Sequence, residues 1–400
     1  MDAHYAQITG QSLLETTGIF ADVTDPEVLP SIWPIKITLP ALAMVQMAMI
    51  DLLRHVGLSP NAVIGHSAGE TAMLYACGAA SQPMALEIAI ARGLAMAELE
   101  ESGGSMAAFS CPAAIAKDII AEVKHQLPSF STSVLEISCY NAFDAVTLAG
   151  HDILLDKAID TARNMGIVAT KLRTRVPVHS SMMEACYSSY FQKLSDVFQK
   201  YPESHFAKTT IATFSTLSGG KWTHEYSPQY FWDNARLPVL FEQTLTNLIK
   251  DMAGATYVEI SPHPVLSKYL LSAGIPAESV LCPMRRNKVG DEWTEYRCFL
   301  QTVGSLTVLG YDVDFLRLNH VSFFPRQSTS FPYPFAKKSV PYHSESSTLI
   351  RRQFEPRNGP LNYGGLKVSA SIQRDLAEHV INSQPIIPAA AFLEMVRYKL

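Results

Sequence analysis

The chain has 400 residues, enough for two or three domains of about 150 residues each. Apolar residues make up 48% of it and charged residues 17%, which excludes an intrinsically disordered chain and predicts a large buried core. The net charge of −5 favours neither a nucleic acid nor an anionic membrane as a partner.

The six cysteines are scattered, and no two of them lie within ten residues of each other. This spacing excludes a CxxC pair for zinc or redox chemistry, so we expect free thiols, no metal site and a cytoplasmic protein. The first residues have no signal-peptide pattern. The most apolar stretch, 39–53, is interrupted by Gln46 and Asp51 and is shorter than a membrane span. We therefore expect a soluble protein with no membrane partner.

The first predicted element is an apolar helix over residues 40–55, with Pro40 in its first turn and Gly57 after its end. The run AVIGH at 62–66 predicts a buried strand, and 67–79 predicts a helix directly after it. A helix, a strand, a sharp turn and a second helix are typical of an α/β protein with a parallel sheet.

A different pattern occupies residues 104–173. Strand, helix, two strands joined by a tight turn at 143–144, helix and strand follow one another. This β-α-β-β-α-β order predicts a ferredoxin-like subdomain inserted into the larger one. The larger subdomain would then comprise residues 1–103 and 174–312, with further helices at 181–200, 238–252 and 264–273 and strands at 209–216 and 255–261.

The composition changes again after residue 312. Proline, serine, aromatic and basic residues alternate over the following stretch, which predicts an extended linker at 313–358. Residues 359–400 begin a different domain.

The strongest local motif is GHSAG at 65–69, a G-x-S-x-G sequence between a predicted strand and a predicted helix. In such a nucleophile elbow the serine hydroxyl lies at the start of a helix, where free N–H groups stabilise developing negative charge. This pattern predicts Ser67 as a nucleophile. A purely structural turn between strand and helix is the alternative.

A nucleophilic serine needs a general base. His179 in RVPVHSSMME is the best candidate among the 12 histidines, because Pro177 and β-branched neighbours make its approach rigid and dry. His66 is next to the serine in sequence, so its side chain should point away from it.

Four ordered motifs carry a family resemblance. GHSAGE at 65–70, a downstream arginine, VPVHSSMM at 176–183 and EISPHPVLSKYL at 259–270 resemble the acyltransferase (malonyl transacylase) domain of polyketide and fatty acid synthases. The resemblance covers residues 8–310 and implies an α/β-hydrolase-like large subdomain with the ferredoxin-like insert. ITGQSLLETTGIF at 8–20 and YPF at 333–335 are similar to fungal highly reducing polyketide synthases.

The resemblance implies a role for each matched residue. Ser67 would accept the acyl group and His179 would act as its base, in a dyad without a carboxylate. Arg92, 25 residues after the serine, would hold the carboxylate of malonyl-CoA. The N–H of Ala68 would be one oxyanion donor, and the main-chain carbonyl of Asn234 would orient the histidine.

Ping-pong acyl transfer follows from these roles. The malonyl group would pass from CoA to the serine and then to the phosphopantetheine thiol of an acyl carrier protein, with no tightly bound cofactor. Neighbouring synthase domains, a ketosynthase and a dehydratase, would be further partners. We expect the three functional groups to meet at the mouth of a cleft between the two subdomains.

The sequence departs from the family pattern in two places. The family's GQG motif, which supplies a second oxyanion donor on the first strand, has no counterpart here, so we expect an N-terminally truncated fragment of weak or no activity. Val178 stands where malonyl-selective members have a bulky aromatic residue, so a branched extender is an alternative to malonyl.

The last residues resemble the start of a polyketide dehydratase domain with a hotdog fold. His379 matches the histidine of its HxxxGxxxxP motif, with Ser383 at the glycine position and Pro388 at the proline. The acid that works with this histidine lies in a second half that the sequence lacks, so we expect no dehydration.

Two alternatives to acyl transfer are open at this point. A serine hydrolase or thioesterase of the α/β type would use the same elbow, but it would place an Asp or Glu between Ser67 and His179 in chain order. The other alternative is a catalytically impaired synthase fragment with a docking or structural role.

Overall fold

A computed structural model describes residues 1–18, 33–202, 211–286, 294–319, 379–386 and 389. The chain divides into two compact units, residues 1–323 and 324–400. Most of the predicted linker at 313–358, and most of the segment at 359–400, lie outside the described residues.

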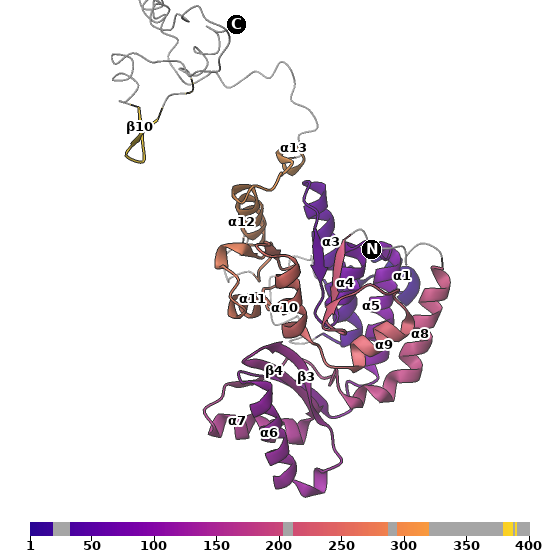
Figure 1. Ribbon diagram of the computed structural model, residues 1–400. Helices are drawn as coiled ribbons and strands as arrows, with labels where there is room; N and C mark the ends of the chain where they lie inside the picture. The colour runs from indigo at the N-terminus through magenta and orange to yellow at the C-terminus, as the bar shows by residue number, and fades with distance from the viewer. Residues whose placement is uncertain (19–32, 203–210, 287–293, 320–378, 387–388, 390–400) are drawn as a thin grey trace, which may run out of the picture. The chain divides into compact units, whose positions relative to one another are not determined.

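Long helices build one layer of the first unit (Figure 1). Helix α3 (Ile35–His55) packs along α5 (Gln82–Ala97) and also contacts α4 (Gly69–Ala76), while α5 contacts α8 (Tyr187–Lys200) on another side. The predicted first helix therefore begins five residues earlier than expected, and Pro40 lies inside it instead of in its first turn.

Helix α3 has 21 residues and is long and apolar enough to cross a membrane by length and composition alone. The prediction that this stretch is too short was therefore wrong, because the helix extends beyond the apolar run at both ends. Eight of its residues, among them Met44 and Met47, are buried against the protein interior, as in the core helix of a globular domain.

Short parallel strands lie beside these helices. Strand β1 (Ala62–Ile64) pairs in parallel with β6 (Ala212–Ser215), and β7 (Gly220–Lys221) adds to β6 in the antiparallel direction. A second parallel pair is formed by β8 (Tyr257–Val258) and β9 (Val280–Leu281). The predicted strands at 209–216 and 255–261 thus correspond to β6 and β8, and residues 209–210 lie outside the described residues.

The insert has its own sheet and its own core. Strands β2 (Gly104–Phe109), β3 (Leu135–Ala142), β4 (Ala145–His151) and β5 (Ala169–Lys171) form an antiparallel sheet of order β3-β4-β2-β5. Helices α6 (Ala113–Gln126) and α7 (Asp152–Asn164) pack together against it, around Phe109, Leu148 and Leu155. The predicted order of elements over 104–173 is confirmed.

Backbone hydrogen bonds join the insert to the larger lobe. Tyr140 N–H donates to Val239 O at 2.8 Å, and Val239 N–H donates to Ser138 O at 2.9 Å. Strand β3 is thereby fixed beside the segment between α9 (Pro228–Arg236) and α10 (Phe241–Asp251). Helix α9 was not predicted.

The remaining elements are helices and short 3-10 turns. They are α1 (Asp2–Thr9), α2 (Leu13–Thr17), η2 (Pro128–Phe130), η3 (Ser181–Cys186), α11 (Ser267–Ser272), η4 (Ala277–Ser279), α12 (Thr294–Val308) and α13 (Phe315–Leu318). The predicted helix at 181–200 is therefore a 3-10 segment followed by α8. In the second unit, β10 (Val380–Ile381) and β11 (Gln384–Pro385) form a hairpin.

Candidate active site

Ser67 lies in the turn between β1 and α4, as the elbow motif predicts. Its φ of 54° is in the left-handed region, which side-chain-bearing residues adopt at a cost. Gly65 is required by close packing, since a Cβ there would be 2.5 Å from Glu70 Cγ. Gly69 is different, because the nearest atom to a Cβ at that position is 3.8 Å away.

His179 is the partner of this serine. Its Nε2 is 2.6 Å from Ser67 Oγ, and its backbone is also left-handed, with φ 62°. The other ring nitrogen, Nδ1, is 3.0 Å from the carbonyl oxygen of Leu237. A carbonyl only accepts, so Nδ1 carries the proton and Nε2 is left as the base toward the serine.

The backbone of His179 is held by the same stretch of chain. Its N–H donates to Ala235 O at 3.0 Å, so the end of α9 fixes both the ring and the main chain of the histidine. The prediction assigned the orienting carbonyl to Asn234. The 3.0 Å hydrogen bond of Nδ1 goes to Leu237 O, three residues later, where α9 has ended. A backbone hydrogen bond to Asn234 also raises the pKa of the ring, so the predicted contact with Asn234 is present beside that with Leu237.

Burial controls the protonation of His179. The side chain is 2% exposed, and burial lowers its pKa well below the usual 6.5. The positive charge of Arg92 and the nearby His66 lower this pKa further, while backbone groups of Leu237 and Asn234 act in the opposite direction. The imidazole is therefore neutral at physiological pH and can accept a proton.

Arg92 is buried in α5, with 2% of its surface exposed. Its NH1 donates to Asn234 Oδ1 at 2.7 Å, whereas its Nε has no hydrogen-bond partner among the described residues. The hydroxyl of Tyr190, which lies near enough to influence the pKa of Arg92, is also buried without a partner in the described part of the chain. Such unsatisfied donors favour an acceptor that arrives with a ligand.

His66 points away from the serine, as predicted. Its Nε2 is 2.8 Å from Asn141 Oδ1 on β3, and its ring packs on Phe241 with centroids 5.3 Å apart. Asn141 in turn donates to Thr147 Oγ1 at 3.1 Å. His66 therefore links the nucleophile turn to the insert and is not positioned as a base.

Two other predicted residues lie next to the dyad. Ala68 directly precedes α4, so its N–H is one of the amide groups at a helix start that the helix itself does not need. Val178 is buried in the main hydrophobic core, and an influence of Val178 on acyl choice stays a prediction. No carboxylate within hydrogen-bond distance of His179 is found among the described residues, and no cluster of metal-ligating side chains is found there either.

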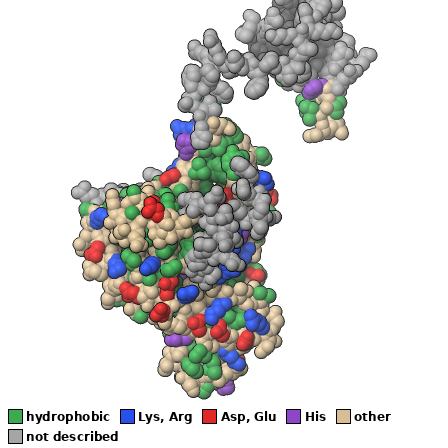
Figure 2. Space-filling view, turned by 180° about the vertical axis from the view of Figure 1, so that it is seen from behind, with side chains coloured by type: hydrophobic (Ala, Val, Ile, Leu, Met, Phe, Trp, Pro, Cys, Tyr) green, Lys and Arg blue, Asp and Glu red, His purple; other side chains and the backbone are tan. Residues whose placement is uncertain are grey.

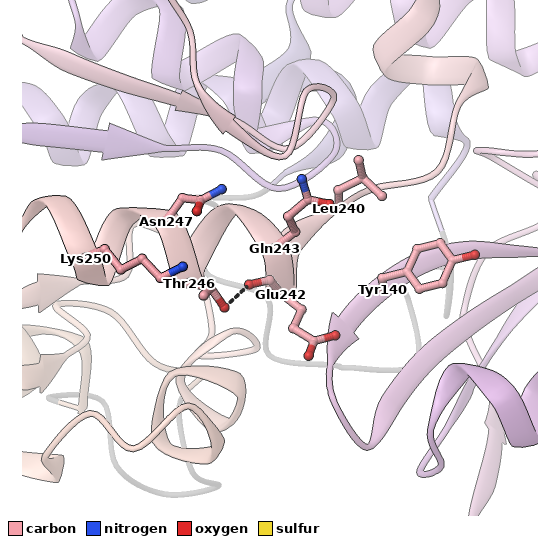
Figure 3. Close-up of a pocket in the computed structure, with 7 residues that line it drawn as sticks. All are labelled: Tyr140, Leu240, Glu242, Gln243, Thr246, Asn247 and Lys250. Atoms are coloured by element: carbon pink, nitrogen blue, oxygen red, sulfur yellow. Dashed lines mark hydrogen bonds between the residues drawn. The ribbon is translucent and has the colours of Figure 1, made fainter.

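A cavity of about 560 Å³ lies close by, but the three predicted groups do not line it. Figure 3 shows its polar lining along α10, with Tyr140 of β3 opposite. Leu240 and Tyr140 border it, and their chain neighbours Phe241 and Asn141 contact His66. Ser67 and His179 meet as expected, the serine half-buried and the histidine buried, but not at the mouth of this cavity.

His379 belongs to the second unit. Its Nδ1 lies 2.9 Å from Ile386 O across the β10–β11 hairpin, and Ile386 N–H donates to His379 O at the same distance. Ser383, at the predicted glycine position, has φ 63°, a conformation that favours glycine. Pro388 lies outside the described residues.

Comparison with known proteins agrees with this geometry. The sequence profile described as "Acyl transferase domain" matches residues 11–311. The chain is 43% identical over 397 residues to the highly reducing polyketide synthase stpks1 of Strobilurus tenacellus, covering 99% of this chain and 14% of that protein. It is 31% identical over 292 residues to the reducing polyketide synthase rdc5 of Metacordyceps chlamydosporia, covering 70% and 11%.

Solved structures share the fold. The acyltransferase domain from the second module of the salinomycin polyketide synthase has a TM-score of 0.63 at 23% identity, over 84% of this chain and 75% of that one. The malonyl CoA-acyl carrier protein transacylase from Clostridium perfringens has a TM-score of 0.61 at 21% identity, over 77% and 89%.

The fold and the serine–histidine pair define an acyltransferase. The chain belongs to the acyl transferase domain family, with relatives among the highly reducing polyketide synthases of fungi, and it spans 14% of the length of the Strobilurus synthase.

Proposed function

We propose that this domain transfers a malonyl group from coenzyme A to the phosphopantetheine thiol of an acyl carrier protein, with Ser67 as the covalent carrier. The observation that carries the proposal is the 2.6 Å contact between Ser67 Oγ and His179 Nε2, with a buried arginine close to it. The name of the Clostridium relative, a malonyl transacylase, agrees with it.

The proposed reaction has two half-reactions. His179 Nε2 takes the proton of Ser67 as Oγ attacks the thioester carbonyl, and the tetrahedral oxyanion collapses with cleavage of the C–S bond. The protonated imidazole returns its proton to the departing CoA sulfur. In the second half-reaction the carrier thiol gives its proton to His179 and its sulfur attacks the acyl-serine ester. The C–O bond to Ser67 then breaks, and the imidazolium returns the proton to Ser67 Oγ.

Arg92 supports a dicarboxylic acyl group over acetyl. It is a buried cation with an unused Nε donor, and no ion pair to it occurs among the described side chains. A guanidinium can hold a carboxylate with two parallel hydrogen bonds, and such charged pairs are strong where water is absent. A branched dicarboxylic extender would make the same contact, so malonyl is the simplest member of the proposed class.

The N–H of Ala68 is the proposed oxyanion donor within this chain. It lies at the start of α4, where the helix dipole also favours negative charge. Among the described residues the partner of His179 Nδ1 is the Leu237 carbonyl, which favours acyl transfer over an α/β-type hydrolase that would place an Asp or Glu there.

The domain boundaries are proposals of the same kind. We assign residues 104–173 to a ferredoxin-like subdomain, supported by the strand order β3-β4-β2-β5 with both helices packed against the sheet. Residues 1–103 and 174–312 form the α/β-hydrolase-like subdomain, supported by the parallel β1–β6 pairing beside the elbow. Residues 313–358 were predicted to be a linker, but Val313 is buried in a core cluster of the first unit and α13 follows it, so we assign the linker to the residues after α13.

The dehydratase assignment for 359–400 and for His379 rests on the resemblance and on the glycine-like backbone of Ser383. The proposed partners are an acyl carrier protein and neighbouring ketosynthase and dehydratase domains, with no tightly bound cofactor. A cytoplasmic location agrees with the six free thiols of the described chain. Basic and acidic side chains intermingle on the face shown in Figure 2, which gives no support to a nucleic-acid partner.

Intact mass measurement tests the proposal. The purified chain is exposed to malonyl-CoA or to acetyl-CoA, and the covalent mass increase is followed with time. We expect malonyl addition that Ser67→Ala abolishes and that Arg92→Ala reduces, and transfer of the group to an added carrier protein. Continuous CoA release without a carrier would instead indicate a hydrolase.

A further inference from the structure

Glu70 is a buried carboxylate that the dyad mechanism does not use. It lies three residues after Ser67 in α4 and is 1% exposed. Its Oε1 accepts hydrogen bonds from Thr216 N–H and Thr216 Oγ1, both at 2.7 Å, and from Ser215 Oγ at 3.2 Å. Its Oε2 accepts a hydrogen bond from the hydroxyl of Tyr230.

These four donors come from two other parts of the lobe. Ser215 ends strand β6 and Thr216 follows it, while Tyr230 lies in α9. The side chain of Glu70 also packs directly beneath Gly65, the first residue of the nucleophile motif. Glu70 thus joins the serine turn, the end of β6 and α9 at one buried point.

Helix α9 and the residues just after it hold the other two functional groups. One turn after Tyr230, Asn234 Oδ1 accepts the hydrogen bond of Arg92 NH1 at 2.7 Å. Ala235 O and Leu237 O accept the hydrogen bonds from the main chain and the ring of His179, both at 3.0 Å. The placement of α9 therefore sets the positions of the base and of the guanidinium.

We infer that Glu70 is a positioning residue that aligns α9 with the nucleophile turn, so that Ser67, His179 and Arg92 act on the same acyl thioester. It acts through Tyr230 and the Ser215–Thr216 turn and does not touch the substrate. The role in acyl selection rests on the proposed function, whereas the alignment of Ser67 with His179 does not.

The four donors around Glu70 favour its carboxylate form, whereas its burial opposes ionisation, and the pKa is raised on balance. Burial raises the pKa of Glu70, and the hydrogen bonds from Tyr230, Thr216 and Ser215 act against that rise. Burial lowers the pKa of Arg92, and the negative charge of Glu70 is among the groups that oppose this. In its ionised form Glu70 therefore stabilises the positive charge of Arg92 from beyond ion-pair distance.

The same lobe offers a matched control. Glu259 is 8% exposed and accepts backbone hydrogen bonds from Val265, Leu266 and Ser267 at 2.7 to 3.0 Å, which ties down the loop before α11. It is a buried carboxylate with comparable hydrogen bonding, but among the described residues its hydrogen-bond partners include no residue of α4 or α9. Glu259→Gln therefore shows how far the loss of a buried, hydrogen-bonded carboxylate that does not join α4 to α9 lowers stability and Ser67 labelling.

The experiment compares Glu70→Gln, Tyr230→Phe and Glu259→Gln with the unchanged 400-residue chain. For each, denaturant unfolding gives stability, a fluorophosphonate probe gives the labelling rate of Ser67, and intact mass gives acylation by malonyl-CoA and by acetyl-CoA. We expect all three variants to be less stable. Only Glu70→Gln and Tyr230→Phe should slow serine labelling, by about tenfold to a hundredfold, because small misplacements of reacting groups cost that much.

Acylation distinguishes alignment from mere folding. At equal folded fraction, Glu70→Gln should lower the maximal rate of acylation by malonyl-CoA by a larger factor than it raises the malonyl-CoA concentration needed for half-saturation. It should also lower the ratio of the malonyl acylation rate to the acetyl acylation rate. Glu259→Gln should leave the ratio of the two acylation rates unchanged, and its rate of Ser67 labelling should stay within about twofold of that of the unchanged chain.

The inference is wrong if Glu70→Gln and Tyr230→Phe match Glu259→Gln in labelling rate. If Glu70→Gln does not fold, Tyr230→Phe, which removes a single hydroxyl, decides the question alone. Failure of the unchanged chain to take up malonyl would contradict the proposed function, and the labelling rates would still test the alignment of Ser67 with His179.

Discussion

Ser67 and His179 are hydrogen-bonded to each other through their side chains, and both have left-handed backbones, with φ of 54° and 62°. Among the described residues of the first unit, they are the two non-glycine residues with positive φ. Backbone strain of this kind persists where the surrounding structure over-determines it, and it is common at functional sites. Here the left-handed backbone at both residues directs the two side chains toward each other.

The strain at Ser67 predicts a stability difference between two inactive variants. Ser67→Gly and Ser67→Ala both remove the hydroxyl, but glycine adopts φ 54° without a Cβ clash. Ser67→Gly should be more stable than Ser67→Ala by about 1 kcal/mol in urea unfolding. Equal stabilities would show that the left-handed turn carries no strain, and acylation of either variant would place the nucleophile elsewhere.

The two glycines of the elbow should respond differently to alanine. At Gly65 a Cβ would lie 2.5 Å from Glu70 Cγ and 2.7 Å from the Glu70 backbone, so Gly65→Ala should destabilise the chain by several kcal/mol and slow acylation. Gly69 begins α4 with open space around it, so Gly69→Ala should be neutral or stabilising by up to about 1 kcal/mol. Thermal unfolding of both variants measures the contrast, and similar losses at both sites would contradict it.

Replacement of Arg92 should separate function from stability. Arg92→Met removes a buried charge with an unsatisfied Nε but also leaves the buried Asn234 Oδ1 without its donor, so the free energy of unfolding should change by no more than about 1 kcal/mol in either direction. Acylation by malonyl-CoA should fall by about 100-fold, because roughly 3 kcal/mol of charged hydrogen bonding is lost, while acylation by acetyl-CoA should not fall. Stopped-flow or quenched-flow mass measurement gives both rates. An equal fall for the two thioesters would contradict a carboxylate clamp.

The low pKa of His179 predicts the pH dependence of the first half-reaction. Because burial holds this pKa well below 6.5, the imidazole stays neutral as the pH falls through 6.5. The acylation rate should therefore be flat from about pH 8 to below pH 6.5 and should decline only at more acidic pH. A decline centred at or above pH 6.5 would show that the ring titrates as an exposed histidine does.

The lowered pKa of His179 also makes the stability of the folded chain depend on pH. A histidine with a depressed pKa in the folded state binds fewer protons than it does when unfolded at mildly acidic pH. Its contribution to stability is therefore present above pH 6.5 and is lost as the pH falls below that value. Denaturant unfolding at several pH values should show this loss in the unchanged chain and a smaller one in His179→Gln.

Much of the local structure could be predicted from the sequence, because it depends on short-range patterns. The apolar period of the helices, the strand before Ser67 and the order of elements over 104–173 follow from spacing and turn residues. The elbow around Ser67 is likewise a local motif. Helix α3 was predicted too short, because Pro40 fits the start of a helix and also, less favourably, its interior.

The contacts between distant segments could not be predicted in this way. Which carbonyl accepts the hydrogen bond of His179 Nδ1–H depends on where α9 ends in space, and the residue type of Leu237 gives no sign of this role. Asn234 was singled out for its main chain, whereas its side chain holds Arg92. Glu70 is a glutamate within a helix, and its burial depends on three segments that converge only in the folded chain.

The sequence by itself therefore determined which residues carry reactive groups and on which elements they lie. Only the tertiary structure decided which groups touch, which charges are buried and which carbonyls orient the imidazole. The physical reason is that helix and strand propensity and hydrophobic periodicity act over a few residues. The hydrogen bonds of His179 and Glu70 join residues 58 to 160 positions apart, and they exist only after packing has brought the segments together.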